Sequence, residues 1–358
     1  MVKELVFTVN GPGELNGLVF PLIRAFRQKF PELICSLYAV PCQFSAGTET
    51  DLAKTSGLFD YVFTTAEYRK YMFRKNWPKN YWPAEQGVVF YCGGDSWHAK
   101  RLSKKYGWPL YGYDEGSVTN KRWFVKLFNR DLDGNLMVDA ALGRDIGYQA
   151  VPIGAPELTV GLYPGSRERH LCLMLGFFGE VAELLKKKYP YINFRWGVNS
   201  ELREFVDKNF PQRFAAPYEQ AGNKYDLIVS LTGTNTAISA ALGIPLLVLL
   251  PFNNPDLIPF SGLLGLISDI PVLGRPFKKL LITCARSRLK FISIPNIKAG
   301  CEVVPELVGY LTPQQVMQKI EHMLLDIEDR RRMHDELPAC IGKPGAQNIV
   351  KYFEEILK

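Results

Sequence analysis

The sequence predicts an α/β protein made of two Rossmann-like domains that face each other across a cleft. Strand-like apolar runs alternate with helical stretches in both halves, and 358 residues exceed what one hydrophobic core usually serves. Pro and Gly interrupt the alternation at Val151–Pro156. We therefore expect an N-terminal domain over residues 1–155, a C-terminal domain over 156–340, and a final helix over 341–358 that packs back on the first domain.

The order of the expected elements is the βαβ order of a mostly parallel sheet with helices on both faces. In the first half, strands are expected at residues 4–10, 33–40, 61–65, 87–93 and 109–113, with helices near 18–30, 48–56 and 98–106. The second half opens with TVGLYPGS at 159–166 and continues with strands at 192–198, 225–231 and 245–251 and helices near 171–188 and 235–242. The last stretch, 348–358, has an amphipathic helical pattern.

The composition is that of a globular protein, with 47% hydrophobic and 22% charged residues. A net charge of +7 favours anionic partners such as nucleotide phosphates or acidic lipid surfaces, and no segment resembles a nucleic-acid-binding module. The start MVKELVFTVNGPG lacks the features of a signal peptide, so we expect a cytoplasmic protein. Seven cysteines without a CxxC pair and four histidines without metal-ligand spacing favour reduced thiols and predict no metal site.

A glycine-rich loop follows the first expected strand. Gly11 and Gly13 would let the backbone approach a ligand, and the start of the next helix favours a phosphate or a polar substrate. The loop lacks the GxGxxG spacing of dinucleotide-dependent dehydrogenases. An ordinary strand-to-helix turn is the alternative interpretation.

Two loops of the second half occupy equivalent positions. Gly165 and Ser166 offer backbone and hydroxyl donors, and Arg167 can neutralise a diphosphate. The turn from Gly233 to Asn235 opens a helix whose N-cap is expected to be Thr234 or Asn235. Since such turns lie at the carboxyl ends of strands, where open α/β sheets bind ligands, binding is the better interpretation than capping alone.

The segment Ile292–Leu307 gathers polar side chains at a turn-rich junction. Asn296, Gly300, Glu302 and Glu306 lie within it, between short apolar runs. The arrangement suits a loop that holds a polar ligand at the end of a strand. The alternative is that Asn296 caps a helix and that both glutamates face water.

Taken together, these loops resemble the lipid-A-disaccharide synthases, glycosyltransferases with the two-domain GT-B fold. The matching segments, in the same order and with similar spacing, are LYPGSR at 162–167, LTGT at 231–234, GIP at 243–245 and SIPNIKAGCEVVPEL at 293–307. NGPGELNG followed by LIRAF at 22–26 is a weaker match to the family's opening loop and helix.

The resemblance implies an inverting transfer of a sugar from a UDP-sugar, with the donor bound mainly by the C-terminal domain and a lipid-like acceptor held by the N-terminal domain. It places Arg167, Asn296 and Glu306 at donor-site positions, and Ser166 and the Gly233-Thr234 turn beside the nucleotide or its phosphates. It implies no metal and no other cofactor, because helix N-termini and Arg can stabilise the leaving diphosphate.

Two departures from the family pattern concern the donor site. The family carries a Glu four residues beyond the Gly-Thr pair, a natural acceptor for the ribose diol, where this chain has Ile238. The arginine that usually follows the Ala-Gly pair is Cys301. The identities of the nucleoside and the sugar, and the retention of activity, are therefore left open.

An inverting transfer needs a group that takes the proton of the acceptor hydroxyl. Asp95 follows the expected strand at 87–93 and is the first candidate, with a helix N-cap as its alternative role. Glu14 and the pair Asp114-Glu115 are further candidates, and His98 is interpreted as a packed or surface residue.

The segment Tyr68–Pro83 interleaves basic and aromatic residues and includes Trp77 and Trp82. This mixture is typical of a segment that contacts an anionic membrane; the alternative is a basic surface loop with both tryptophans in the core. A weaker example covers 257–266 and 274–290, which is too short and interrupted to span a bilayer.

The leading hypothesis is thus a peripheral membrane glycosyltransferase that moves a sugar from a UDP-sugar to a lipid-like acceptor. One rival is a UDP-sugar epimerase or hydrolase of GT-B fold, and another is a non-catalytic relative that binds sugar nucleotides. The expected partners are a nucleotide sugar, the acceptor and a membrane surface, without nucleic acid; a homodimer is left open.

Overall fold

The chain folds into two compact units, as seen in a computed structural model that describes residues 3–41, 49–73, 80–116, 118, 120–210, 215–253 and 290–357. The first unit comprises Met1–Gly143 and Gly342–Lys358, and the second unit comprises Arg144–Ile341. The first unit ends before Val151–Pro156, so that residues 144–155 belong to the second unit.

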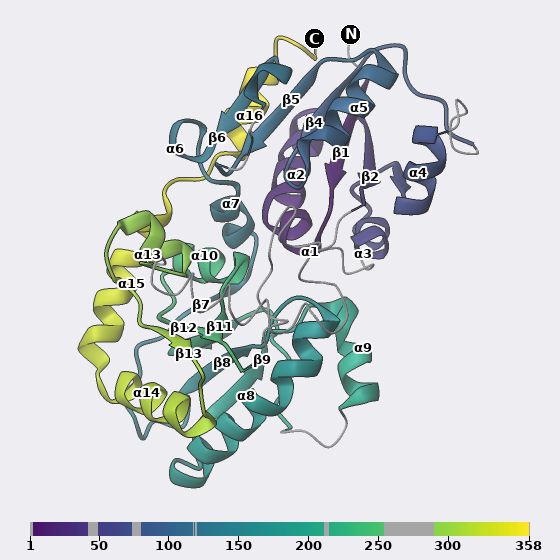
Figure 1. The fold of residues 1–358 in the computed structure, drawn as a ribbon. Coiled ribbons are helices and arrows are strands. Elements are labelled where there is room, and N and C mark those ends of the chain that lie inside the picture. The colour runs from purple at the N-terminus through teal and green to yellow at the C-terminus, as the bar shows by residue number, and fades with distance from the viewer. Residues whose placement is uncertain are drawn as a thin grey trace. The chain divides into compact units, whose positions relative to one another are not determined.

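The first unit is built on a six-stranded parallel sheet of order β3-β2-β1-β4-β5-β6 (Figure 1). Its strands are β1 (Glu4–Val9), β2 (Ile34–Ala39), β3 (Tyr61–Phe63), β4 (Gly87–Tyr91), β5 (Leu110–Asp114) and β6 (Lys126–Asn129). Because the chain runs outward from β1 to β3 and then returns to β4 on the other side, the strand order reverses between β1 and β4.

Helices cover both faces of this sheet. They are α1 (Pro12–Glu14), the π-helix η1 (Leu15–Val19), α2 (Phe20–Lys29), α3 (Glu49–Thr55), α4 (Thr65–Phe73), α5 (Ser96–Tyr106), the 3₁₀ helix η2 (Lys121–Trp123), α6 (Arg130–Asp133), α7 (Leu136–Leu142) and α16 (Ala346–Phe353). The helix expected near 18–30 begins earlier, at Pro12, because a proline fits the first helical position. The C-terminal α16 packs on α2 and belongs to the first unit.

The second unit contains a five-stranded parallel sheet of order β13-β12-β11-β8-β9 and a separate pair, β10 and β7. The strands are β7 (Ile146–Tyr148), β8 (Thr159–Tyr163), β9 (Asn193–Trp196), β10 (Asn223–Tyr225), β11 (Leu227–Leu231), β12 (Leu246–Pro251) and β13 (Glu306–Gly309). Here the strand order reverses between β8 and β11, which corresponds to the reversal between β1 and β4 in the first unit.

The helices that the structure describes in the second unit pack against one another. They are α8 (Glu168–Lys188), α9 (Ser200–Asn209), α10 (Thr234–Ala241), α13 (Ile294–Ala299), α14 (Pro313–Leu325) and α15 (Ile327–Ile341). Helix α8 packs against α14 and α9, whereas α10, α13 and α15 pack against one another. The prediction of an α/β protein with two Rossmann-like domains is confirmed; how the domains face each other stays a prediction.

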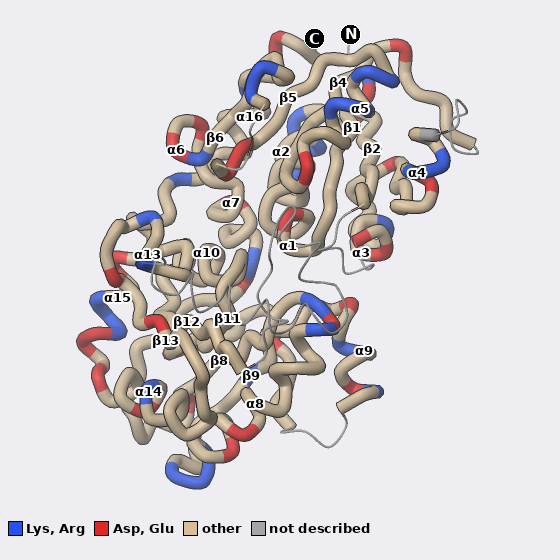
Figure 2. The backbone as a smooth tube through the Cα atoms, in the orientation of Figure 1, with Lys and Arg blue, Asp and Glu red and all other residues tan. Residues whose placement is uncertain are grey.

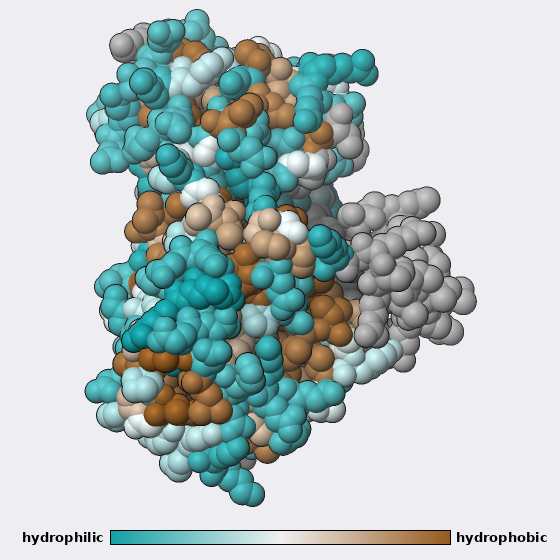
Figure 3. Space-filling model, turned by 90° about the vertical axis from the view of Figure 1, so that its left-hand side faces the viewer, coloured by the Kyte–Doolittle hydropathy of each residue, from teal (hydrophilic) through white to brown (hydrophobic). Residues whose placement is uncertain are grey.

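The described surface is mixed in charge and hydropathy. Figure 2 shows basic residues at the end of α8, where Lys186–Lys188 complement the negative end of the helix dipole. Figure 3 shows apolar residues in separate groups among polar ones on the visible face. Leu132 and Trp82 are 85% and 82% exposed. No helix within the described part of the chain combines the length and the apolar character needed to cross a membrane.

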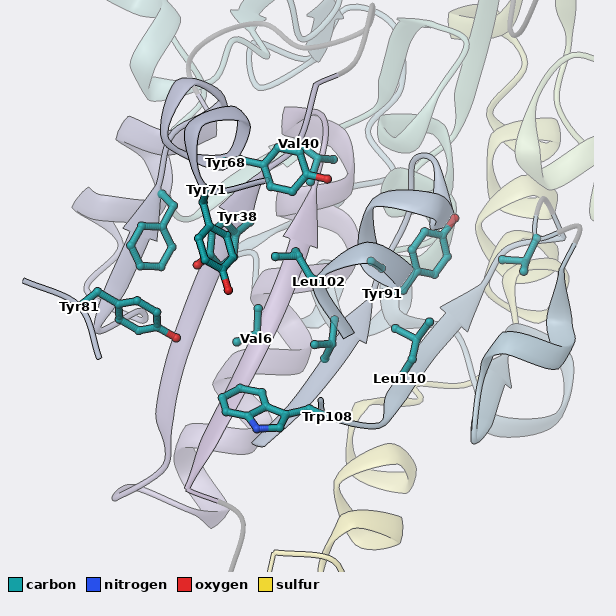
Figure 4. Packing of buried hydrophobic residues seen from close by; sticks show 14 residues of the cluster. Val6, Tyr38, Val40, Tyr68, Tyr71, Tyr81, Tyr91, Leu102, Trp108 and Leu110 are labelled. Atoms are coloured by element: carbon teal, nitrogen blue, oxygen red, sulfur yellow. The ribbon is translucent and has the colours of Figure 1, made fainter. Parts of the chain in front are cut away.

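The core of the first unit is rich in tyrosine on one face of the sheet (Figure 4). It combines side chains from β1, β2, β4 and β5 with side chains from α4 and α5, among them Val6, Tyr38, Tyr68, Tyr71, Tyr91, Leu102 and Leu110. Since side chains alternate along a strand, the neighbours of these residues face the other side, where Phe90 lies 6.0 Å from the ring of Phe353. Both faces of the sheet are therefore buried, as expected for parallel strands.

A fully buried ion pair connects α15 to the amino ends of β8 and β11. The Arg330 guanidinium donates to Asp226 Oδ1 at 2.9 Å, and both side chains have zero exposure. Asp226 also accepts from the backbone N–H groups of Val151 and Thr159 and from the Gln149 amide, at 2.9 to 3.0 Å. Burial raises the pKa of Asp226, and these donors together with Arg330 oppose the shift.

We predict that Arg330→Met destabilises the second unit by about 3–5 kcal/mol, because it leaves the Asp226 carboxylate buried and unpaired. Urea unfolding followed by circular dichroism measures the loss. Arg332→Met is the matched control, since Arg332 lies on the same helix, is 44% exposed and pairs with Asp329 at the surface; it should cost less than about 1 kcal/mol. Equal losses in the two variants would contradict the role of the buried pair.

Candidate functional site

In the first unit, the loops after β1 and β4 meet where the strand order reverses. A Cβ atom on Gly93 would lie 2.6 Å from the Glu14 carboxyl carbon, and one on Gly94 would overlap the Asn10 amide. Both glycines have φ in the left-handed region, at +138° and +75°. This close approach therefore requires glycine, and it places Glu14 beside the loop that carries Asp95 at the reversal point, the usual ligand site of such a sheet.

Asp95 is exposed and caps α5. Its Oδ1 accepts from the backbone N–H of Trp97 at 2.9 Å, so Asp95 has the helix N-cap role that the sequence indicated as its alternative. The neighbouring His98 Nδ1 lies 2.6 Å from the Tyr68 hydroxyl, and burial lowers the pKa of this histidine. His98 is thus a neutral, hydrogen-bonded residue that supports the loop, as interpreted from the sequence.

The other acidic candidates after β5 have different surroundings. Asp114 is buried and accepts from the backbone N–H groups of Gly116 and Val118 at 2.8 and 3.1 Å, which fixes its own turn. Glu115 is exposed. Asp114 is therefore committed to the turn, whereas Asp95, Glu14 and Glu115 stay candidates for the general base.

The loop after β1 leads directly into helical structure. Gly11 is extended, with φ of −164°, and Gly13 lies within α1, so neither glycine is required by its backbone angles. Residues 15–19 form a π-helix, a rare element that often marks functional sites. The loop is thus distinguished by its π-helix more than by the two glycines singled out in the sequence.

In the second unit, the loop after β8 leads into α8. Arg167 is the N-cap residue of this helix, and its side chain does not cap it. His170 packs against Gly165, and burial, reinforced by the charges of Arg167 and Arg169, lowers the pKa of His170 to about 4. The histidine is neutral near pH 7, so the positive charge beside Ser166 comes from the two arginines.

The turn after β11 differs from its prediction in one respect. The N-cap of α10 is Gly233, and neither Thr234 nor Asn235. Gly233 has φ of +139°, an angle that Thr and Asn rarely adopt, so helical backbone can begin at Thr234. The N-cap provides no side chain for the first N–H groups of α10, which is the arrangement expected where a ligand takes the place of the cap.

Asn296 is fully buried and all its hydrogen-bonding groups are used within the protein. Its Oδ1 accepts from the backbone N–H groups of Val303 and Val304 at 2.8 and 2.9 Å. Its Nδ2 donates to the Val304 carbonyl at 2.8 Å and to Glu306 Oε1 at 2.7 Å. The helix cap is Ser293, not Asn296 as the alternative interpretation expected, and Asn296 fastens α13 to the following loop.

Glu306 fixes the entry to the same helix. Its Oε2 accepts from Ile292 N–H at 2.9 Å, and its Oε1 accepts from the N–H and hydroxyl of Ser293 at 2.8 and 2.6 Å. The carbonyl of Ile292 in turn accepts from the Thr232 hydroxyl at 2.7 Å, which connects this segment to the turn before α10. Asn296 and Glu306 are therefore a rigid support for that turn.

The other two candidates of this segment are less constrained. Glu302 is exposed, and Gly300 ends α13 in the left-handed conformation, with φ of +69°. Cys301, which stands where the family pattern has an arginine, is also exposed.

A pocket of about 170 Å³ lies within the second unit at the carboxyl ends of β8 and β9. It is lined by Arg144, Tyr163, Gly197, Val198, Asn199, Ser200, Arg203, Glu219 and Asn235. Asn235 connects it to the turn after β11, and Tyr163 precedes the loop that carries Ser166 and Arg167. The predicted ligand loops and the pocket thus lie at one edge of one sheet.

Sequence reasoning missed most of this lining. Glu219 comes close to β9 through a single parallel bridge between Trp196 and Tyr218, too short to leave an apolar run in the sequence. Arg144 precedes β7, a strand of three residues that was also missed. The only available signal was the position of Glu219 shortly before an expected strand at 225–231.

Comparison with solved structures identifies the class of architecture. The chain superposes over 99% of its length on a putative UDP-N-acetylglucosamine 2-epimerase from Listeria monocytogenes, covering 97% of that chain with a TM-score of 0.55 and 13% identity. UDP-GlcNAc 2-epimerase from Neisseria meningitidis, bound to UDP-GlcNAc, gives a TM-score of 0.54 at 15% identity, with 100% and 99% coverage. The fold is that of the GT-B class.

Within that class, the chain is similar in sequence to lipid-A-disaccharide synthases. It is 26% identical over 196 residues to the enzyme of Nitrosococcus oceani, covering 52% of this chain and 45% of the relative. It is 25% identical over 220 residues to that of Sulfurihydrogenibium sp., covering 55% and 50%. The chain spans about half the length of the curated relatives it matches, and no family model matches it.

We predict that Asn296→Ala destabilises the second unit by about 2–4 kcal/mol, because it leaves the buried N–H groups of Val303 and Val304 without acceptors. Thermal unfolding measures the change. Glu302→Ala, in the same segment but exposed, should change stability by less than about 0.5 kcal/mol. An Asn296→Ala protein as stable as Glu302→Ala would contradict this structural role of the amide.

Proposed function

We propose that the protein is a GT-B glycosyltransferase that moves a sugar from a UDP-sugar to a lipid-like acceptor with inversion at the anomeric carbon. The observation that carries the proposal is the convergence, at one edge of the second sheet, of the loop with Arg167, the turn with Gly233 and the polar pocket. Similarity to lipid-A-disaccharide synthases supports the acceptor class.

The donor diphosphate would lie between the starts of α8 and α10. Each helix begins without a side-chain cap, and Arg167 and Arg169 add positive charge. Backbone N–H groups and a guanidinium can then stabilise the charge that develops on the leaving UDP. The proposal requires neither a metal ion nor another cofactor.

The transfer step needs one base. The Asp95 carboxylate takes the proton of the acceptor hydroxyl while the oxygen of that hydroxyl attacks the anomeric carbon of the donor sugar. The bond between that carbon and the diphosphate oxygen breaks, and UDP leaves. The Asp95 side chain is exposed and its Oδ1 accepts from the Trp97 N–H, so we assign the role of proton acceptor to Oδ2. Glu14, beside the same loop, is the second candidate.

Contact with a membrane surface is part of the proposal. Trp82 is 82% exposed and lies in the segment Tyr68–Pro83 that interleaves aromatic and basic residues, so it is not one of the core tryptophans of the alternative interpretation. Such a side chain suits a lipid headgroup interface. Trp77, residues 257–266 and residues 274–289 lie outside the described residues.

A donor screen tests the proposal. Purified protein is incubated with UDP-sugars and a total lipid extract, and the products are examined by mass spectrometry. A glycosylated lipid together with free UDP is the expected result. Free sugar without lipid would favour a hydrolase, an isomerised UDP-sugar would favour an epimerase, and binding without turnover would favour a non-catalytic relative.

We predict that Asp95→Asn lowers transfer at least about 100-fold while leaving UDP affinity and stability unchanged, because the amide still caps α5 but cannot take a proton. Asp95→Ala should lose transfer equally and also about 1 kcal/mol of stability. Initial rates, calorimetry and thermal unfolding separate the effects. Glu115→Gln is the control; loss of transfer in that variant, with Asp95→Asn active, would move the base to Glu115.

A further inference from the structure

The loop that carries Asp95 begins with two glycines. Gly93 and Gly94 have φ of +138° and +75°, and consecutive glycines restrict a backbone less than any other pair of residues. After the glycines, the Asp95 backbone is held by α5, because its carbonyl accepts from the His98 N–H at 3.1 Å and its Oδ1 caps the helix. Before Asp95, the glycines themselves impose no such restraint. A carboxylate that must meet an acceptor hydroxyl in one geometry needs a restraint on this side too.

The hydroxyl of Tyr91 provides this restraint. It donates to the Gly94 carbonyl at 2.8 Å. That carbonyl belongs to the peptide group whose nitrogen is that of Asp95, and a peptide group is planar. Holding the carbonyl oxygen therefore holds the plane through which the chain enters Asp95. The Asn10 amide lies against the same glycine, since a Cβ atom on Gly94 would be 2.2 Å from Asn10 Nδ2.

Tyr91 is itself held by packing. It is the last residue of β4, is 2% exposed and belongs to the tyrosine-rich face of the core (Figure 4). Its ring centroid lies 5.7 Å from that of Phe124. Gly112 on the neighbouring strand leaves space for both rings, because a Cβ atom there would lie 3.1 Å from Tyr91 Cβ and 2.7 Å from Phe124 Cε1. The hydroxyl is thus presented by a closely packed ring on an inner strand of the sheet.

A buried tyrosine hydroxyl needs a hydrogen-bond partner for structural reasons alone, and Tyr38 is an example. Tyr38 is fully buried on β2, and its hydroxyl lies 2.9 Å from that of Tyr106, within the same tyrosine-rich face. Tyr38 and Tyr91 pair with the same residue of β1, Thr8, from its two sides. The two tyrosines differ in what their hydroxyls hold: another side chain for Tyr38, and the loop with the candidate base for Tyr91.

We propose that Tyr91 is a positioning residue for sugar transfer: through the Gly94 carbonyl it holds the backbone that carries Asp95, so that the carboxylate is in place when the acceptor hydroxyl arrives. This inference rests on the proposed function, since it concerns the base of the same reaction. Tyr91 acts through the backbone and takes no proton itself. Its contribution is to pre-organise the base, which affects the rate of the chemical step and not the affinity for the donor.

Tyr91→Phe tests the inference, because it removes the hydroxyl and keeps the ring against Phe124. Transfer is measured with the UDP-sugar that glycosylates the lipid extract. Turnover at saturating UDP-sugar should fall about tenfold, since a misplaced reacting group is costly, and KM for the UDP-sugar should stay within about twofold. Tyr38→Phe is the matched control. Each variant loses one buried hydroxyl and should lower Tm by about 2–4 °C, but Tyr38→Phe should keep turnover within about twofold of wild type.

A double-mutant cycle with Asp95→Asn separates positioning of the base from a general effect on the fold. Added to Asp95→Asn, Tyr91→Phe should lower turnover further by less than about twofold, because the group that it positions is already lost. Independent effects would multiply the two losses. Thermal unfolding identifies a variant that fails to fold. Gly112→Ala, whose new methyl group would press on the Tyr91 ring, then replaces Tyr91→Phe in the cycle with the same expected result.

Three results overturn the inference and leave the proposed function intact. They are wild-type turnover in Tyr91→Phe, a loss that multiplies with that of Asp95→Asn, and an equal loss in Tyr38→Phe, which would show a general effect of a missing buried hydroxyl. A wild-type protein that forms no glycosylated lipid from any UDP-sugar overturns the proposed function itself, and the positioning role of Tyr91 with it.

Discussion

The second unit depends on one buried carboxylate. Asp226 receives hydrogen bonds from Arg330 on α15, from Thr159 at the start of β8 and from Val151 in the segment before it. Its own N–H donates to the Thr159 carbonyl at 2.9 Å. These bonds set the register of β8 against β11 at their amino ends, and the carboxyl ends of the same strands carry the predicted phosphate loops. A buried ion pair of this kind contributes little net stability relative to apolar residues of the same size. Removal of either partner is nevertheless strongly destabilising, because it leaves an unpaired charge in the core.

The two units place their candidate residues by the same rule. In the main sheet of each unit, the first strand pairs on one side with the next strand in sequence. On the other side it pairs with a strand reached after the reversal, so that two loops meet at the carboxyl edge. Gly93 and Gly94 bring the loops together in the first unit through close packing on Glu14 and Asn10. In the second unit the corresponding connection is a hydrogen bond from Thr232 to Ile292, supported by Asn296 and Glu306.

The sequence was sufficient for the central strands of both main sheets and for the loops that follow them, because buried parallel strands leave apolar runs and the following turns leave Gly, Ser and Thr. It missed the short strands β6, β7 and β13, two of which form sheet edges. It was insufficient for the roles of individual polar residues. Asn296 was expected to face a donor or to cap a helix, but its amide bonds to backbone groups of Val303 and Val304 and to the Glu306 carboxylate. The positions of these partners depend on the turn between them and not on composition. Glu219 and Arg144 were missed because they lie in short or irregular segments, 75 positions apart, that only the folded chain brings together.

The missing acid on α10 has a physical explanation in the surroundings of Ile238. This side chain is 2% exposed and its helix packs against α13 and α15, so position 238 contributes to the core. A glutamate there would be buried, and the cost of burying a charge without a partner is several kcal/mol. The helix that carries the acid in the family pattern is therefore used here for packing. Glu219, which lines the pocket of this unit, lies outside α10 and accepts hydrogen bonds from Tyr163 and Tyr225, so the pocket has a carboxylate although position 238 has none.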